Sequence, residues 1–179
     1  MIKHGEKFFK VIGQIGQIGQ IGVTMIERKS FEVNGVARRM MDFVGQIRAV
    51  MFGPGDMELV TGSPGGRRRY LDFVISQMDR EYRRCAISYE KGLRQRNKLL
   101  DMIRDGVAER SQLFFWDKLL IKNGQYMTDR RADFLARTGF EYDRSEISEV
   151  RLAQYEVEEV AAGSTLVGPH RDDFIFVGE

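Results

Sequence analysis

The sequence has one cysteine, no long apolar run and no glycine-rich phosphate loop, and each absence excludes a class of protein. With Cys85 as its single cysteine, the chain forms no internal disulfide, which fits a reducing compartment. No stretch approaches the ~18 consecutive apolar residues of a membrane span, and the N-terminus lacks the apolar core of a signal peptide. The pattern Gly-x-x-x-x-Gly-Lys-Ser/Thr is absent, so the sequence contains no P-loop. We therefore expect a cytoplasmic protein without a membrane partner.

The composition suits one globular domain or two small subdomains, since 42% of the 179 residues are hydrophobic and 30% are charged. The net charge of +2 hides an asymmetry. Residues 67–98 contain ten Lys/Arg against four Asp/Glu, whereas residues 141–179 contain three against ten. This segregation indicates either a surface that faces a polyanion or two ordinary solvated faces, and composition does not separate these interpretations.

The N-terminal part of the chain has the pattern of β structure. Residues 8–12 and 23–33 are rich in apolar and β-branched side chains, and Asn34-Gly35 then accepts the positive φ angles of a tight hairpin turn. Residues 47–52 are a further strand candidate, ended by Gly53-Pro54-Gly55. We predict strands in these three segments.

Residues 12–22 consist of a Gly-Gln-Ile triplet repeat. Its isoleucines recur every three residues, which matches neither the strand period of about 2 nor the helix period of about 3.6. The glycine spacing also differs from that of a dinucleotide site. We interpret the repeat as a poorly constrained loop or a distorted strand without a direct functional role.

After Gly62 the pattern changes to helix. Ser63 is a candidate N-cap, and Pro64 suits the first helical position. Apolar residues then recur near the helical period up to about Asp105, with a possible break near Asp79. An unbroken helix of that length would span roughly 60 Å, which indicates a long arm.

Gly106 ends this first helix, and a second helical pattern runs from Ser111 to Gly139. Two amphipathic helices joined by a short connection bury their apolar stripes against each other, so we predict an antiparallel helical hairpin. Cys85 falls on the apolar face of the first helix and is predicted to be a packed thiol. Beyond Phe140 we predict strands around residues 150–157 and 174–177.

Arg67, Arg68 and Arg69 stand at the start of the first helix. A cationic cluster can bind phosphates, although positive charge at a helix N-terminus opposes the helix dipole by a few tenths of a kcal/mol. These three residues are therefore candidate contacts to DNA or phosphate, with a buried ion pair to Asp56 or Asp72 as the structural alternative. The same two interpretations apply further along the helix, where a solvated face is favoured over a DNA contact for Arg94, Arg96 and Lys98.

Residues 163–173 combine two glycines, a proline, a histidine, an arginine and adjacent carboxylates behind a short apolar run. The tripeptide at residues 170–172 matches the catalytic tripeptide of kinases, but Val177 stands where a kinase has its metal-binding Asn. His170 with Asp172 and Asp173 is a weak signature of a divalent-cation site. We predict neither a catalytic residue nor a metal in this loop.

Three blocks of the sequence, at residues 52–72, 89–100 and 163–173, resemble conserved segments of the bacterial RecF family in the order in which that family has them. The first block contains Phe-Gly-Pro-Gly-Asp and Ser-Pro-Gly-Gly-Arg-Arg-Arg, and the last contains Gly-Pro-His-Arg-Asp-Asp. The resemblance covers nearly the whole chain. It marks as family-motif residues Asp56, Gly168, Pro169, His170, Arg171, Asp172 and Asp173.

RecF proteins are ABC-type ATPases related to the heads of SMC proteins. The resemblance implies an α/β fold, α+β in this segment, that is part of an ABC-ATPase head with a long antiparallel helical-hairpin lobe. It implies ATP and Mg as cofactors of the full-length family, a homodimer formed on ATP, and binding to single-stranded or gapped DNA. It also implies action in DNA replication, gap repair and the SOS response. In that work the family protein, with RecO and RecR as its partners, loads RecA onto DNA.

On this basis we assign residues 1–62 to the β-rich end of ATPase lobe I, residues 63–140 to the helical-hairpin arm of lobe II, and residues 141–179 to a β-rich return toward the signature loop. The family's P-loop, signature loop and Walker B acids have no counterpart in the sequence, and Gly53 and Gly55 depart from its pattern.

We therefore expect an internal fragment or truncated gene product that binds neither ATP nor Mg well and does not hydrolyse ATP alone, since phosphoryl transfer needs the phosphate cradle and the metal-holding carboxylates together. A non-catalytic helical-hairpin module that docks a protein partner is the alternative. An enzyme centred on His170 and Asp172 is a more distant one.

Overall fold

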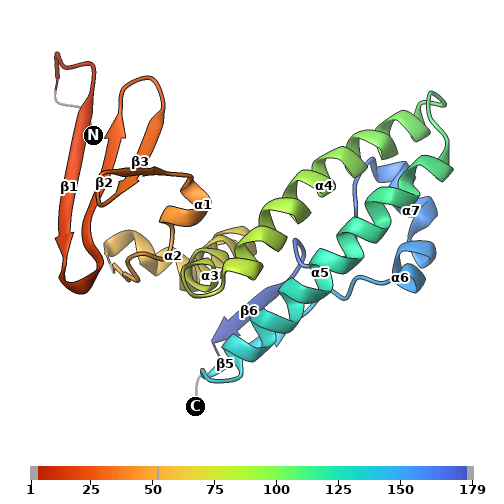
Figure 1. Ribbon diagram of the computed structural model, residues 1–179. Coiled ribbons are helices and arrows are strands. Elements are labelled where there is room, and N and C mark those ends of the chain that lie inside the picture. The colour runs from red at the N-terminus through yellow and green to blue at the C-terminus, as the bar shows by residue number, and fades with distance from the viewer. Residues whose placement is uncertain (1–3, 52, 177–179) are drawn as a thin grey trace. The chain divides into compact units, whose positions relative to one another are not determined.

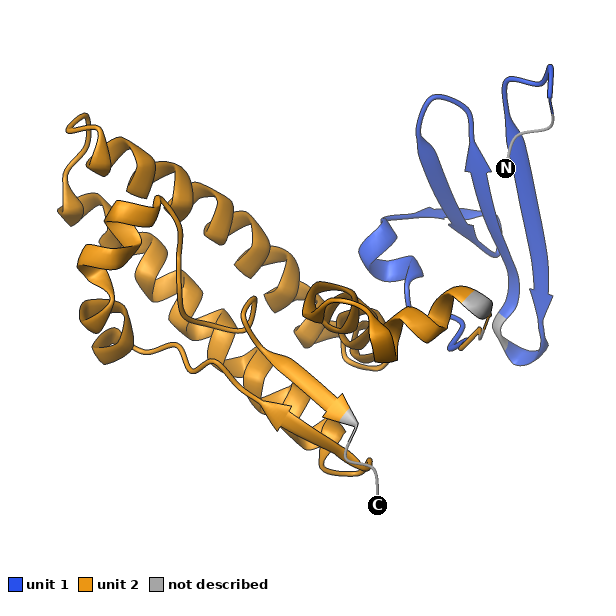
Figure 2. Cartoon of the chain, turned by 180° about the vertical axis from the view of Figure 1, so that it is seen from behind, with its two compact units in different colours: residues 1–49 blue, residues 50–179 orange. Residues whose placement is uncertain are grey.

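The computed structural model describes residues 4–51 and 53–176, which fall into two compact units, Met1–Ala49 and Val50–Glu179 (Figures 1 and 2). The boundary lies ahead of the expected one at residue 62, and residues 63–140 and 141–179 belong to one unit.

The first unit is a four-stranded antiparallel sheet in the order β1-β2-β3-β4, followed by one helical turn. Asn34 and Gly35 have φ angles of 51° and 76°, which confirms the predicted hairpin turn between β3 and β4. The strand expected at residues 8–12 is confirmed as β1. The segment expected as one strand at residues 23–33 is extended but is divided by a bend at residues 26–28 into the end of β2 and the whole of β3. The elements of this unit are β1 (Phe9–Ile15), η1 (Gly16–Ile18), β2 (Gly19–Met25), β3 (Lys29–Val33), β4 (Val36–Arg38) and α1 (Met40–Phe43).

The triplet repeat forms the β1–β2 hairpin, so of the two interpretations offered for it, the strand is supported and the poorly constrained loop is wrong. The register places Ile12 opposite Gly22 and Ile15 opposite Gly19, and it sets glutamine against glutamine at positions 14 and 20. A period of three is therefore self-complementary in this hairpin, because each isoleucine of the repeat that lies in β1 or β2 faces a glycine across the ladder. A Cβ atom at position 22 would collide with Glu32 on β3, which gives that glycine a packing reason.

The prediction of a strand at residues 47–52 is also wrong for residues 47–51, which are the part of this segment that the structure describes. Residues 47–51 are irregular, and Phe52 lies outside the described residues. A strand needs a neighbour to complete its backbone hydrogen bonds, and none of the described strands pairs with this segment. Met51 is 89% exposed, so the apolar pattern here does not mark a core-facing strand.

The second unit is built on a helical hairpin, as predicted, in which α4 and α5 lie antiparallel side by side (Figure 1). The short helices α6 and α7 pack against the end of the hairpin that contains the α4–α5 connection, and the β5–β6 ribbon lies toward the other end. The elements of this unit are η2 (Pro54–Met57), α2 (Glu58–Thr61), α3 (Pro64–Met78), α4 (Arg80–Arg104), η3 (Arg110–Leu113), α5 (Phe114–Leu135), β5 (Phe140–Asp143), α6 (Glu149–Gln154), α7 (Glu156–Ala162) and β6 (Asp173–Phe176).

The break near Asp79 is confirmed, so no continuous helix of about 60 Å exists. Asp79 has extended backbone angles (φ −122°, ψ 107°) and separates α3 from α4. Its carboxylate accepts a hydrogen bond from the backbone N–H of Tyr82 at 2.8 Å and so caps α4. The side chain therefore both ends one helix and starts the next.

The prediction of strands around residues 150–157, and with it a β-rich segment 141–179, is wrong. The residues form α6 and α7 because Ser148 caps the first helix, accepting from the N–H of Arg151 at 3.2 Å, while Leu152 packs into the core. Gly163, with φ 61°, ends the second helix in the left-handed conformation that favours glycine. The strand predicted at 174–177 is confirmed as β6 up to Phe176, and Val177 lies outside the described residues.

The core of the second unit lies between α3, α4, α5 and the ribbon, and Tyr82, Tyr89 and Leu120 are among its buried side chains. Cys85 is 4% exposed within it, which confirms the packed thiol. None of the described helices is both long and apolar enough to cross a membrane.

Candidate functional site at the Gly163–Asp173 loop

The loop between α7 and β6 runs along the helical hairpin and brings the family-motif residues against α3, α4 and α5. Its path depends on Gly168, whose φ of 118° is a backbone conformation that other residues rarely adopt. A Cβ atom at this position would collide with the hydroxyl of Tyr89 and lie 3.2 Å from the side chain of Ile147. The glycine therefore lets the loop backbone lie directly on α4.

His170 is held on both sides of its ring. Its Nε2 lies 3.0 Å from the carbonyl oxygen of Thr165, and its Nδ1 lies 2.9 Å from the hydroxyl of Tyr89. Because a carbonyl only accepts, we assign the proton to Nε2, so that Nδ1 accepts from the tyrosine. Burial lowers the pKa of His170 to about 4, and the imidazole is therefore neutral near pH 7.

Asp172 is buried in an ion pair with Arg131 of α5. The arginine donates to the Asp172 carboxylate at 2.7 Å, to the Pro169 carbonyl at 2.7 Å and to the Asp72 carboxylate at 2.7 Å. Burial opposes the charge of this guanidinium, but the carboxylate of Asp72, the phenol of Tyr82 and the carboxylate of Asp172 raise the pKa of Arg131 well above its ordinary value. The cluster ties α3, α5 and the loop together.

Arg67 forms the buried ion pair that the sequence indicated, but with a different partner. It binds Asp173 through two hydrogen bonds of 2.7 and 2.8 Å, not Asp56 or Asp72. The hydrogen bond from Arg67 lowers the pKa of Asp173. Asp56 instead accepts from the backbone N–H of Gly53 within η2.

Arg96 is buried as well, so the prediction that it lies on a solvated helix face is wrong. It is 2% exposed and pairs with Glu159 at 2.7 Å and Asp117 at 2.7 Å. It also donates to the Thr165 hydroxyl at 2.9 Å and so fixes the start of the loop. Arg94 does lie on a solvated face, where it pairs with Glu90 at 2.6 Å.

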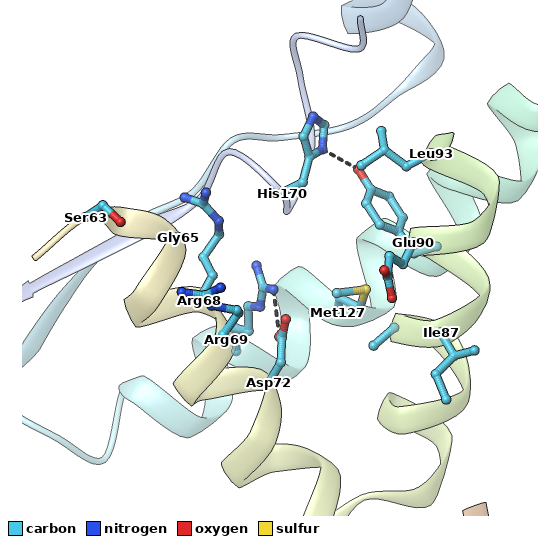
Figure 3. Close-up of a pocket in the computed structure, with 13 residues that line it drawn as sticks. Ser63, Gly65, Arg68, Arg69, Asp72, Ile87, Glu90, Leu93, Met127 and His170 are labelled. Carbon is cyan, nitrogen blue, oxygen red and sulfur yellow. Dashed lines mark hydrogen bonds and ion pairs between the residues drawn. The ribbon is translucent and has the colours of Figure 1, made fainter. Parts of the chain in front are cut away.

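Arg68 and Arg69 differ from the ion-paired arginines. Both line a cleft of about 700 Å³ between α3, α4 and His170 (Figure 3). Arg68 donates to the backbone carbonyl of Asp172 at 2.7 Å and forms no ion pair with a described residue. Burial and the charge of Arg131 lower the pKa of Arg68. Arg69 is exposed and has no hydrogen bond or ion pair within the described ranges. The cleft therefore presents two cations without a carboxylate partner.

The side chains that formed the weak signature of a metal site are already engaged in hydrogen bonds and ion pairs within the protein. His170, Asp172 and Asp173 bind Tyr89, Arg131 and Arg67 respectively, and the described residues contain no group of three or more His, Cys, Asp or Glu arranged around a metal site. The same residues contain no glycine-rich phosphate loop of the P-loop pattern.

Sequence reasoning missed the members of the site that lie far from the loop. Arg131 is 41 residues from Asp172, and Tyr89 is 81 residues from His170. The polar triplet at residues 129–131 on an otherwise amphipathic helix was the available signal for Arg131. Pattern alone does not indicate which carboxylate such an arginine meets.

No protein-family profile matches the chain. Among curated proteins, the chain is 39% identical over 171 residues to the DNA replication and repair protein RecF of Herpetosiphon aurantiacus, covering 81% of the chain and 44% of that protein. It is 36% identical over 194 residues to that of Thermomicrobium roseum, covering 84% of the chain and 49% of that protein. The chain thus spans about half the length of the curated relatives it matches.

The solved structures agree. The recombination mediator protein RecF of the RecFOR pathway, in its RecF-ATPrS structure, superposes with a TM-score of 0.86 at 26% identity, over 96% of this chain and 56% of that one. Its RecF-ATP structure gives a TM-score of 0.85. Over the part of that protein which it spans, the chain belongs to the RecF family of DNA replication and repair proteins.

Proposed function

We propose that this chain contributes the helical arm and the motif loop of an ATP-dependent DNA-binding protein that acts in DNA replication and recombinational gap repair. Its relatives are named for replication and repair, and the similar solved structures are of a mediator in the RecFOR pathway. The proposal includes RecO and RecR as partners, single-stranded or gapped DNA as ligand, and pairing with a second copy on ATP. Such work takes place on the chromosome, so the proposed location is the cytoplasm.

One observation supports a DNA contact at a particular place. Of the arginines around the motif loop, Arg67, Arg96 and Arg131 are paired with carboxylates, whereas Arg68 and Arg69 line an open cleft and form no ion pair with the residues described. The pKa of Arg68 is lowered by burial and by Arg131, which means that its charge is poorly compensated within the protein. A phosphate at the cleft would supply the missing negative charge. We therefore propose Arg68 and Arg69 as the phosphate contacts.

The test is the affinity of the chain for a short labelled duplex and a single strand, measured by fluorescence anisotropy over a range of salt concentrations. Arg69→Ala is the cleaner variant because Arg69 makes no hydrogen bond or ion pair with the residues described. We expect weaker binding to every sequence and a salt slope that is shallower by about 1. Arg137→Ala, at an exposed arginine beyond α5, is the matched control. Equal affinities and slopes for the two variants would contradict this assignment.

ATP is the cofactor that the family implies, and it would supply the energy for an ATP-dependent conformational change. The residues described here hold the loop and the arm in place and do not by themselves hold a nucleotide. We propose that the 179-residue chain does not hydrolyse ATP on its own. Phosphate release above the background of the buffer, measured with the purified chain, would contradict this.

A further inference from the structure

A second groove lies on the helical hairpin, formed by one face of α4 and the first turns of α5. Its volume is about 490 Å³. On α4 it is lined by Arg84 and Ser88, whereas the cleft described above is lined by Ile87, Glu90 and Leu93. Because successive residues of a helix are 100° apart, these two sets point to different sides of α4. The groove is therefore separate from the cleft that holds Arg68 and Arg69.

Aromatic side chains at the groove are exposed to solvent. Phe114 and Phe115, at the start of α5, are 63% and 62% exposed. Lys118 lies over the ring of Phe114, with its Nζ atom 4.2 Å from the ring centroid. Phe115 meets the ring of Trp116 edge to face at a centroid distance of 4.9 Å. Two adjacent phenylalanines left in water on a helix surface are the kind of apolar feature that marks a binding site.

The charged side chains that line the groove are all basic. Its lining includes Arg84, Lys118 and Lys122, and none of its described lining residues is acidic. Arg84 is partly neutralised by Glu81, with which it forms an exposed ion pair. Lys122 is exposed and has no partner in the part of the chain that the structure describes. The groove therefore attracts a polyanion and offers it aromatic faces.

We propose that this groove binds single-stranded DNA, with bases stacked on Phe114 and Phe115 and with Lys118 and Lys122 against the phosphates. The inference rests on the proposed DNA-binding function and assigns it a second contact. Aromatic side chains combined with a cationic groove are the features that bind unpaired strands, since a base in a duplex has both faces covered by its neighbours. An acidic protein segment is the other occupant that this chemistry would accept.

The single tryptophan makes the test specific to the site. Trp116 contacts Phe115, so a base stacked at the groove should quench Trp116 fluorescence, whereas binding at the cleft of Arg68 and Arg69 should not. The full chain is titrated with an oligothymidylate of about 15 nucleotides, near the upper site size of single-strand binders. An abasic oligonucleotide of the same length keeps the phosphates and removes the bases.

We expect quenching by the oligothymidylate and binding at least about tenfold weaker for the abasic strand. In anisotropy, Phe114→Ala with Phe115→Ala should weaken oligothymidylate binding by a similar factor, while Phe114→Trp should retain it. Phe73→Ala is the matched control, because Phe73 is a 58% exposed phenylalanine on α3 that lines neither groove. Circular dichroism of each variant is the check that it is folded.

Each other outcome has a defined meaning. If single strands bind with full affinity to the Phe114→Ala, Phe115→Ala variant but more weakly to Arg69→Ala, the groove assignment falls and the proposed function stands. Equal affinity for the abasic strand would also overturn the stacking. If an acidic peptide quenches Trp116 and the oligothymidylate does not, the groove is a protein-docking site instead. If no DNA binds at all, both proposals fall.

Discussion

The guanidinium of Arg131 donates to the carboxylate of Asp172 at 2.7 Å, and the two residues are only 1% and 2% exposed. The same arginine binds Asp72 on α3 and the carbonyl of Pro169, so one side chain connects three segments that are distant in sequence. A buried ion pair is often no more stabilising than an apolar replacement of both partners, but loss of one partner leaves an uncompensated charge. The pair therefore fixes where the motif loop lies on the arm.

Arg131→Met should be among the most destabilising single changes in the second unit. It leaves the carboxylates of Asp72 and Asp172 without their cation, and we expect a loss of about 3–5 kcal/mol in the free energy of unfolding. Urea unfolding followed by the fluorescence of Trp116, which lies on α5, reports this unit specifically. Arg137→Met, at an exposed arginine, should change the value by less than about 0.5 kcal/mol. A loss below about 1 kcal/mol for Arg131→Met would contradict the role given to the pair.

The helical hairpin was predictable because its signals are local. Apolar residues at the helical period and Gly106 after the end of α4 are read from neighbouring residues alone, as are Ser63 and Pro64 at the start of the preceding helix α3. The strand predicted at residues 150–157 failed because Val150 and Val157 favour β structure in isolation. Both valines are exposed, at 75% and 68%, and the helices are set by the cap at Ser148 and by buried Leu152. Tertiary packing overrode the local preference there.

The site was predictable only in part. The motif loop and the arginine cluster were found because unusual residue types stand together in sequence. Which arginine is buried depends on its partners, and those are distant: Asp173 for Arg67, and Glu159 for Arg96. Neither pairing leaves a trace in spacing or composition. The structure was therefore needed to distinguish the arginines that are paired with carboxylates from those that are not, and the proposed phosphate contact depends on that distinction.

Substitution of two glycines should have opposite effects. Gly168→Ala places a Cβ atom against the hydroxyl of Tyr89 at a φ of 118°, so we expect a loss of at least about 2 kcal/mol of stability. Gly66→Ala lies in the first turn of α3, where nothing is within 4 Å of the new atom, and should stabilise by about 0.5 kcal/mol. Both values come from urea unfolding. A neutral Gly168→Ala would show that the loop backbone can move away from α4.

Asp173 should contribute to the fall in the free energy of unfolding at acidic pH. Its pKa is lowered in the folded state by the hydrogen bond from Arg67, so its contribution is complete above the unfolded value of about 3.9 and is lost as the pH falls further. Asp173→Asn should cost about 1–2 kcal/mol at pH 7, and the difference from the wild type should shrink below about pH 3. Asp129→Asn, at an exposed carboxylate on α5, serves as the control. A constant difference across this range would mean that the ion pair is not responsible.

His170 gives a pH dependence in a separate window. Burial lowers its folded pKa to about 4, against about 6.5 in an unfolded chain, so between these values the unfolded state binds more protons. Stability from this group is therefore complete above about pH 6.5 and is lost as the pH falls toward 4, with a total of about 3 kcal/mol. His170→Gln should remove this slope, and His4→Gln, at the exposed histidine of the first unit, should retain it.

The pKa of His170 in the folded state can be measured directly by nuclear magnetic resonance titration of the imidazole C–H signals. The signal of His170 should remain that of a neutral ring down to about pH 5, because burial lowers its pKa and because its Nδ1 accepts from Tyr89, which only the neutral form can do. Tyr89→Phe removes the hydroxyl and leaves Nδ1 without its donor, so the titration of His170 should move toward higher pH. An imidazole that titrates near pH 6.5 in the folded wild type would mean that the loop is open to solvent and that the packing against α4 does not persist in solution.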